Sequence, residues 1–139
     1  MKFTGEQCVP GNTDSRIQKD HLSRYEFVKK YVKGGVVLDL ACGTGYGSRM
    51  IQDFSAKRTY GMDISEEAIA YAKNNYEDGE LKFILGSVDK LPFEDSFFDV
   101  IVSFETIEHL DSKKRDCFLK ELHRVLKKDG FFILSIRQN

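Results

Sequence analysis

The chain has 139 residues, of which 41% are hydrophobic and 31% charged, and this composition is that of an ordinary globular protein with one domain. Its 21 basic and 22 acidic residues give a net charge of −1, which argues against a nucleic-acid partner. Three widely spaced cysteines argue against a disulfide framework or a zinc site. Because no apolar run resembles a secretion signal or a membrane span, we expect a cytoplasmic protein without a membrane partner.

Apolar residues predict helices and strands in alternation along the chain. Helical spacing is found from Ile17 to Val32, and Gly34-Gly35 ends it. Short apolar runs bounded by turn residues then predict strands, and Ser65 is the expected N-cap of a helix. The predicted strands are 36–40, 58–63, 82–86, 98–104 and 131–136, and the later helices are 46–54, 66–77 and 113–127, the last stopped by Asp129-Gly130.

This alternation predicts the α/β class, with a doubly wound parallel sheet and helices on both faces. Ligands of such sheets bind beyond the carboxyl ends of the strands. Three segments meet there: the glycine-rich turn 39–47 after the first strand, Asp63 after the second, and Phe104-Glu105 after the fourth. We therefore expect one cleft at that edge of the sheet.

The glycine-rich turn and Asp63 together are typical of an adenosine site. Gly43 and Gly45 permit a tight turn and a close approach of a ligand to the backbone. A carboxylate at the end of the second strand, here Asp63, can accept hydrogen bonds from both ribose hydroxyls. A glycine-rich turn and a carboxylate in this arrangement can bind either NAD or S-adenosylmethionine.

Two features favour S-adenosylmethionine. The glycine spacing is G-x-G-x-G, because Ser48 takes the place of the third glycine in the dinucleotide pattern. The carboxylate of Asp39 would repel a pyrophosphate but suits a ligand that carries a sulfonium and an ammonium group. The alternative for Asp39 is a hydrogen bond to the backbone amides of the turn, and the alternative function is that of an NAD-dependent oxidoreductase.

Five motifs in order, across residues 36–136, resemble the class I (Rossmann-like) S-adenosylmethionine-dependent methyltransferases. The resemblance implies strand order 3-2-1-4-5, S-adenosylmethionine as the cofactor, S-adenosylhomocysteine as the product, and an acceptor that we expect to be a small molecule or a sugar. A cofactor-binding protein without catalysis is the alternative. The motifs are 39–47, 61–65, 91–93, 98–101 and 121–130.

The resemblance also implies roles for single residues around the cofactor. Asp63 would bind the ribose and Ile64 would pack on the adenine. The residues that would hold the methionine portion are Asp39, Ala41, Gly43 and Gly45, with Phe104 close by.

The adenine contact departs from the family pattern. Family members often carry an aspartate after the third strand, whereas this chain has Ser87, followed by Val88 and Asp89. A serine hydroxyl can accept the same hydrogen bond without a charge, or Asp89 can take that part. The backbone amide of Val88 would be unaffected.

Residues 105–109 have the sequence Glu-Thr-Ile-Glu-His, and its spacing resembles a metal-binding segment of some methyltransferases. Many family members without a metal carry the same Glu-His pair, so we expect no metal. If the acceptor is a hydroxyl, a base helps to remove its proton, and Glu105 and His109 are the candidates. The charged run Lys113–Arg115 is interpreted as the solvated face of the last helix.

The sequence also predicts features at the two ends of the chain. Residues 1–139 are expected to form one domain, with 1–35 as an N-terminal lid and helix in which Arg24 and Tyr25 contact the cofactor. The family usually adds two strands after the fifth, so the domain is expected to be incomplete at its C-terminus. The fifth strand would then be an exposed edge, which predicts a homodimer through it.

Overall fold

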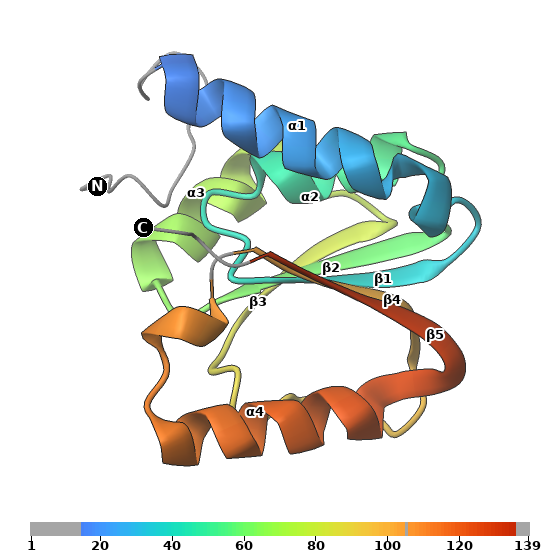
Figure 1. Ribbon diagram of the computed structural model, residues 1–139. Helices are drawn as coiled ribbons and strands as arrows, with labels where there is room; N and C mark the ends of the chain where they lie inside the picture. The colour runs from blue at the N-terminus through green and yellow to red at the C-terminus, as the bar shows by residue number, and fades with distance from the viewer. Residues whose placement is uncertain (1–14, 105, 136–139) are drawn as a thin grey trace.

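The computed structural model describes residues 15–104 and 106–135, with side chains from residue 23 onward. Five parallel strands form one sheet in the order β3-β2-β1-β4-β5, which confirms the predicted fold class and strand order. Helices α1, α2 and α3 cover one face and α4 covers the other (Figure 1). The elements are α1 Ser15–Val32, β1 Val36–Leu40, α2 Tyr46–Asp53, β2 Arg58–Asp63, α3 Glu66–Tyr76, β3 Leu81–Leu85, β4 Phe98–Phe104, the 3-10 turn η1 Ile107–His109, α4 Ser112–Val125 and β5 Leu126–Ser135.

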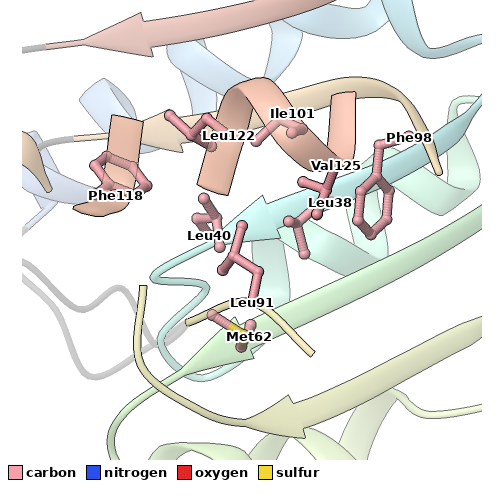
Figure 2. Close-up of a cluster of buried hydrophobic side chains, with 9 residues drawn as sticks. All are labelled: Leu38, Leu40, Met62, Leu91, Phe98, Ile101, Phe118, Leu122 and Val125. Atoms are coloured by element: carbon pink, nitrogen blue, oxygen red, sulfur yellow. The ribbon is translucent and has the colours of Figure 1, made fainter. Parts of the chain in front are cut away.

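Two apolar layers hold the helices on the sheet. Strand β1 is central and lies between helices on both faces, so its sequence is apolar at nearly every position. Toward α1 and α2, Val37 and Val102 pack against Val28 and Ile51. Toward α4, Leu38 and its neighbours form the larger cluster drawn in Figure 2. Its buried members are Leu38, Leu40, Met62, Leu91, Phe98, Ile101, Phe118, Leu122 and Val125.

The motifs at 91–93 and 121–130 are in direct contact. The guanidinium of Arg124 donates to the carbonyl oxygens of Leu91 and Phe93, each at 2.8 Å. The carboxylate of Glu121 accepts the backbone N–H of Leu91 at 2.8 Å and also binds Arg124. These bonds fix the loop before β4 against α4.

Helix α4 ends at Val125, two residues before the predicted end, and Asp129-Gly130 lies inside β5 instead of stopping the helix. The backbone N–H groups of Ser96 and Phe97 donate to the carbonyl oxygens of Arg124 and Val125. The last turn of the helix is therefore satisfied by the loop before β4. The contact depends on distant residues, so helical periodicity could not reveal it.

The pairing of β5 with β4 is irregular where the helix was expected. Phe98 pairs with Leu126 and Val100 with Phe131, so residues 127–130 stand opposite Asp99 alone. The Nζ atom of Lys127 lies 3.1 Å from Oδ1 of Asp99 and holds this bulge.

The start of α3 follows the prediction, because Oγ of Ser65 accepts the N–H of Ala68 at 3.2 Å. Strand β3 begins at Leu81, one residue before the predicted start. None of the helices within residues 15–104 and 106–135 is long and apolar enough to cross a bilayer.

Candidate functional site

A cleft of about 420 Å³ lies at the carboxyl ends of β1, β2, β3 and β4, where the sequence predicted one. Each of these four strands contributes the residues that follow it, and α4 adds one from its first turn. The volume lies in the range of small-molecule sites. The lining residues are Ala41, Gly43, Asp63, Ile64, Ser65, Gly86, Ser87, Val88, Phe104, Thr106, His109, Leu110 and Lys114.

The glycine-rich turn enters the cleft in a left-handed backbone conformation. Its φ angles are 56° at Ala41, 58° at Gly43 and 91° at Gly45. A left-handed alanine costs about 1 kcal/mol, and such strain is typical of functional loops. A side chain at Gly45 would lie 2.6 Å from Cβ of Ala72, so this glycine lets the start of α2 pack on α3. Gly45 is not among the described residues that line the cleft.

Asp63 ties the turn to the next loop and faces the cleft. Its Oδ2 accepts the N–H of Gly43 at 2.8 Å, and its Oδ1 accepts the N–H of Ser65 at 2.9 Å. The carboxylate is therefore held in one orientation while remaining partly open to the cleft. Beside it, the apolar side chain of Ile64 is 70% exposed.

Asp39 lies beneath the turn and does not join the described lining of the cleft. Its side chain is 1% exposed and accepts hydrogen bonds from the hydroxyls of Ser48 at 2.7 Å and Tyr25 at 3.1 Å. Its partners are thus two side chains and not the amides of the turn. Burial raises the pKa of Asp39 from 3.8 to about 7, although both hydroxyls act in the opposite direction. The charge of Asp39 is therefore sensitive to a cation nearby.

Tyr25, in α1, packs against residues that adjoin the cleft. Its ring lies against Gly47, where a Cβ would come within 2.0 Å of Cζ, and it meets the ring of Phe104 edge-on at 5.0 Å. Tyr25 was predicted to contact the cofactor, but its side chain is buried and bonds to Asp39. Arg24 does not line the cleft within the described part of the chain. Of the predicted N-terminal lid and helix, 1–35, residues 1–14 lie outside the described residues.

The wall at the end of β3 is polar. The hydroxyl of Ser87 donates a short hydrogen bond to the carboxylate of Asp89. This bond lowers the pKa of Asp89, and the ammonium of Lys114 lowers it further. Ser87, Val88 and Lys114 line the cleft, whereas Asp89 is not among the described lining residues.

The wall at the end of β4 carries one of the two candidate bases, His109. His109 is exposed, lines the cleft and has its Nε2 atom 3.5 Å from Oε1 of Glu108. Glu105 lies outside the described residues. In the chain that the structure describes, no three metal-ligating side chains come together.

Sequence reasoning missed part of the lining. Lys114 was assigned to the solvated face of its helix, but it is half-buried and lines the cleft. Thr106 was missed because only the charged residues of segment 105–109 and His109 were considered, and Leu110 was missed because it follows that segment without a motif of its own. The serine in the third glycine position, Ser48, was noticed, and its bond to Asp39 supplies the physical reason for it.

Comparison with known proteins agrees with the fold and shows the family. Residues 38–134 match the family described as "Methyltransferase domain". A Mycolicibacterium smegmatis protein named "Probable S-adenosylmethionine-dependent methyltransferase" is 32% identical over 97% of this chain and 51% of its own length. A fatty-acid O-methyltransferase of the same organism is 31% identical over 85% of this chain and 45% of its own length.

Solved structures share the fold of this chain. The crystal structure of a Pyrococcus horikoshii protein superposes with a TM-score of 0.76 and 36% identity, over 87% of this chain and 58% of that one. The chain spans about half the length of the curated relatives it matches. The family match covers most of the chain and includes the glycine-rich turn, Asp63 and the cleft. The chain belongs to the class I S-adenosylmethionine-dependent methyltransferases, a family whose cofactor is S-adenosylmethionine.

Proposed function

We propose that this chain binds S-adenosylmethionine in the cleft and transfers its methyl group to a small-molecule or sugar acceptor. The observation that carries the proposal is the convergence of three features in one cleft: the left-handed turn at Ala41 and Gly43, the fixed carboxylate of Asp63, and the exposed apolar side chain of Ile64. Backbone, carboxylate and apolar surface are what an amino acid, a ribose and a purine require.

The residues present fit this cofactor. Asp63 would accept hydrogen bonds from the ribose hydroxyls, and Ile64 and Val88 would pack on the base. The turn from Ala41 to Gly43 would hold the methionine portion, together with Phe104. Asp39 would act through its charge, because two hydroxyls already occupy its carboxylate.

When bound, S-adenosylmethionine supplies a methyl group that is activated by the sulfonium sulfur. The carbon–sulfur bond breaks as a bond from the acceptor atom to the methyl carbon forms, and the chain contributes orientation and exclusion of water. For a hydroxyl acceptor, we propose His109 as the base that would take the proton, and its position in the lining of the cleft supports this role. Glu105 is proposed as the alternative base, from its position after β4 in the sequence.

The acceptor class is proposed from a relative and from the charge of the chain. A similar protein is named a fatty-acid O-methyltransferase, whose acceptor is a small molecule. The net charge of −1 does not favour a nucleic acid. A cytoplasmic location is part of the same proposal.

A binding experiment tests the cofactor. Isothermal titration calorimetry should detect S-adenosylhomocysteine but not NAD. Asp63→Asn should weaken the binding at least tenfold, because a charged acceptor for the ribose hydroxyls is lost. Asp53→Asn, on the exposed end of α2, is the matched control and should bind like the wild type. Tighter binding of NAD than of S-adenosylhomocysteine would favour an oxidoreductase.

An activity experiment tests the base. With an acceptor found by screening, His109→Ala should lower the rate of methyl transfer and leave the affinity for S-adenosylhomocysteine nearly unchanged. A wild-type rate in His109→Ala would remove His109 from the proposal. Cofactor binding with no transfer to any acceptor would favour a binding protein without catalysis.

We also propose that the 139-residue chain forms a dimer through β5. This strand pairs only with β4 among the described strands, and Phe131 on it is 53% exposed. Phe131 meets Tyr31 at 5.4 Å between ring centroids, and Tyr31 meets the exposed Phe27 at 5.9 Å. The edge and the aromatic side chains beside it form a surface suited to association.

A further inference from the structure

Tyr25 joins helix α1 to the buried carboxylate of Asp39, which lies beside the glycine-rich turn. The phenol oxygen of Tyr25 is 3.1 Å from Oδ2 and 3.2 Å from Oδ1 of Asp39, although 14 residues separate the two in sequence. Both side chains are buried, with exposed fractions of 7% for Tyr25 and 1% for Asp39. A hydrogen bond out of contact with water acts more strongly on its partner than the same bond at the surface.

The ring of Tyr25 is positioned by groups other than Asp39. It lies against Gly47, in the first turn of α2, so closely that a Cβ there would come within 2.0 Å of Cζ. It also meets the ring of Phe104 edge-on, at 5.0 Å between centroids, and Phe104 lines the cleft. Removal of the hydroxyl alone therefore leaves the packing of the ring in place and changes what Asp39 accepts.

Other groups face the carboxylate of Asp39 from the elements around it. Ser48, in α2, donates to its Oδ2 at 2.7 Å. Burial raises the pKa of Asp39 to about 7, and the charge of Asp63, at the end of β2, adds a smaller rise. The bonds from Ser48 and Tyr25 lower the pKa. Burial raises the pKa of Cys42, in the turn, so its thiol stays neutral while Asp39 titrates. The two hydroxyls therefore favour the charged form of Asp39 in a site where burial opposes it.

A carboxylate balanced in this way can distinguish two ligands that differ by one charge. The sulfur of S-adenosylmethionine is a cation, whereas that of S-adenosylhomocysteine is neutral. We propose, on the basis of the proposed cofactor binding, that the hydroxyl of Tyr25 keeps Asp39 ionised and oriented, so that helix α1 favours the cationic cofactor over its product. Tyr25 is a positioning residue in this account, because it acts through Asp39 and is not among the described lining residues of the cleft.

The first test removes the hydroxyl and keeps the ring. Calorimetry on the full chain compares the wild type with Tyr25→Phe between pH 6 and 9, with S-adenosylmethionine and with S-adenosylhomocysteine. Loss of the bond raises the pKa of Asp39 further, so fewer molecules carry its charge at pH 7. At that pH the variant should bind S-adenosylmethionine about two- to fivefold more weakly, with a smaller change for S-adenosylhomocysteine.

The pH profile separates this role from a structural one. At pH 9 Asp39 is ionised in both proteins, so their affinities for S-adenosylmethionine should agree. The titration of the ligand itself is common to both and cancels in the ratio. A loss by the same factor at every pH, or equal affinities of the two proteins at pH 7, would overturn the inference.

The matched control is Tyr31→Phe, which removes a hydroxyl from the same helix at a ring that meets Phe131. It should follow the wild type at every pH. A shifted profile in Tyr31→Phe would show that any change in α1 has this effect and would count against Tyr25. Failure of the wild type to bind either ligand would instead overturn the proposed function and the inference with it.

The second test asks whether Tyr25 acts through Asp39. In Asp39→Asn the side chain carries no charge, so adding Tyr25→Phe should leave the affinity for S-adenosylmethionine unchanged between pH 6 and 9. An equal loss in both backgrounds would exclude Asp39 as the intermediary. Ser48→Ala keeps the test available if Asp39→Asn does not fold, because it removes the other hydroxyl from Asp39 and should shift the profile in the same direction as Tyr25→Phe. An unshifted profile in Ser48→Ala would contradict the proposal.

Discussion

Asp39 is a carboxylate with two hydroxyl partners and almost no contact with solvent. Desolvation favours its neutral form, and the bonds from Ser48 and Tyr25 favour the charged form without overcoming the burial. A group of this kind responds strongly to a positive charge nearby. The ammonium and sulfonium groups of S-adenosylmethionine carry such a charge, so Asp39 is proposed to act on the cofactor without direct contact.

The raised pKa of Asp39 predicts a pH-dependent stability. The folded chain holds a proton that the unfolded chain releases near pH 4, so this stabilising contribution is complete below pH 4 and is lost as the pH rises to about 7. Relative to Asp39→Asn, whose side chain does not titrate, the wild type should lose stability between pH 4 and 7. Urea unfolding of both proteins across this range measures the difference. Parallel pH profiles would contradict the assignment.

The raised pKa of Asp39 also predicts that the affinity for S-adenosylmethionine depends on pH. A cationic ligand favours the ionised carboxylate, so the wild type should bind S-adenosylmethionine more tightly as the pH rises through 7, with release of a proton. Asp39→Asn should lack this dependence. Calorimetry in two buffers with different ionisation enthalpies counts the released protons.

At the scale of elements, the attachment of the loop before β4 to α4 depends in part on Arg124. Its guanidinium binds two carbonyl oxygens and the carboxylates of Asp95 and Glu121, and these partners raise its pKa further. Without this side chain, the loop before β4 would keep its bonds to Glu121 and to the backbone of the helix end but would lose those from the guanidinium. Half-buried carbonyl groups would lose their partner.

Arg124→Met is expected to lower the free energy of unfolding by about 1–3 kcal/mol, the cost of leaving polar partners unsatisfied. The methionine keeps most of the apolar stem, so packing changes little. Arg115→Met, on the exposed face of the same helix, is the control and should remain within about 0.5 kcal/mol of the wild type. Equal effects of the two substitutions would mean that the Arg124 bonds do not stabilise the contact between α4 and the loop before β4.

The contact between α1 and α2 predicts that Gly47→Ala lowers stability when Tyr25 is present and raises it when Tyr25 is replaced. Gly47→Ala places a Cβ against the ring of Tyr25, which should destabilise the fold by about 1–3 kcal/mol through overpacking. In a Tyr25→Ala background the clash is absent. Alanine is a better helix former than glycine by about 1 kcal/mol, so Gly47→Ala should then stabilise.

Denaturant unfolding of the four proteins in this cycle gives the coupling between the two positions. Gly79→Ala is the control, because a Cβ at Gly79 meets no atom within 4 Å, and it should be nearly neutral. A destabilisation by Gly47→Ala that persists without the Tyr25 ring would have another cause.

At the scale of the whole molecule, the proposed dimer predicts that the edge of β5 controls the oligomeric state. Phe131→Lys places a charge on the exposed edge and should shift the chain to a monomer in sedimentation equilibrium. Leu119→Lys, on an exposed position of α4, should leave the state unchanged. A wild-type chain that is monomeric at high concentration would contradict the proposal.

Most of the fold could be predicted because it depends on local patterns. The apolar runs of β1 and β4, the glycine-rich turn and the cap at Ser65 each specify their own segment. The end of α4 could not be predicted, because the N–H groups that close it come from Ser96 and Phe97. Helical periodicity continues to Leu126, so the spacing of apolar residues does not mark the end of the helix at Val125.

The sequence by itself determined which strands end in the cleft and which residues follow them, among them Gly43, Asp63 and Ser87, because parallel strands bring their carboxyl ends to one edge. The tertiary structure decided which neighbours those residues have. In the folded chain, Asp39 is buried and accepts hydrogen bonds from the hydroxyls of Tyr25 and Ser48, and Lys114 of α4 lines the cleft. Burial and charge act through space, so the ionisation of a carboxylate and the direction of a hydroxyl cannot be inferred from spacing along the chain.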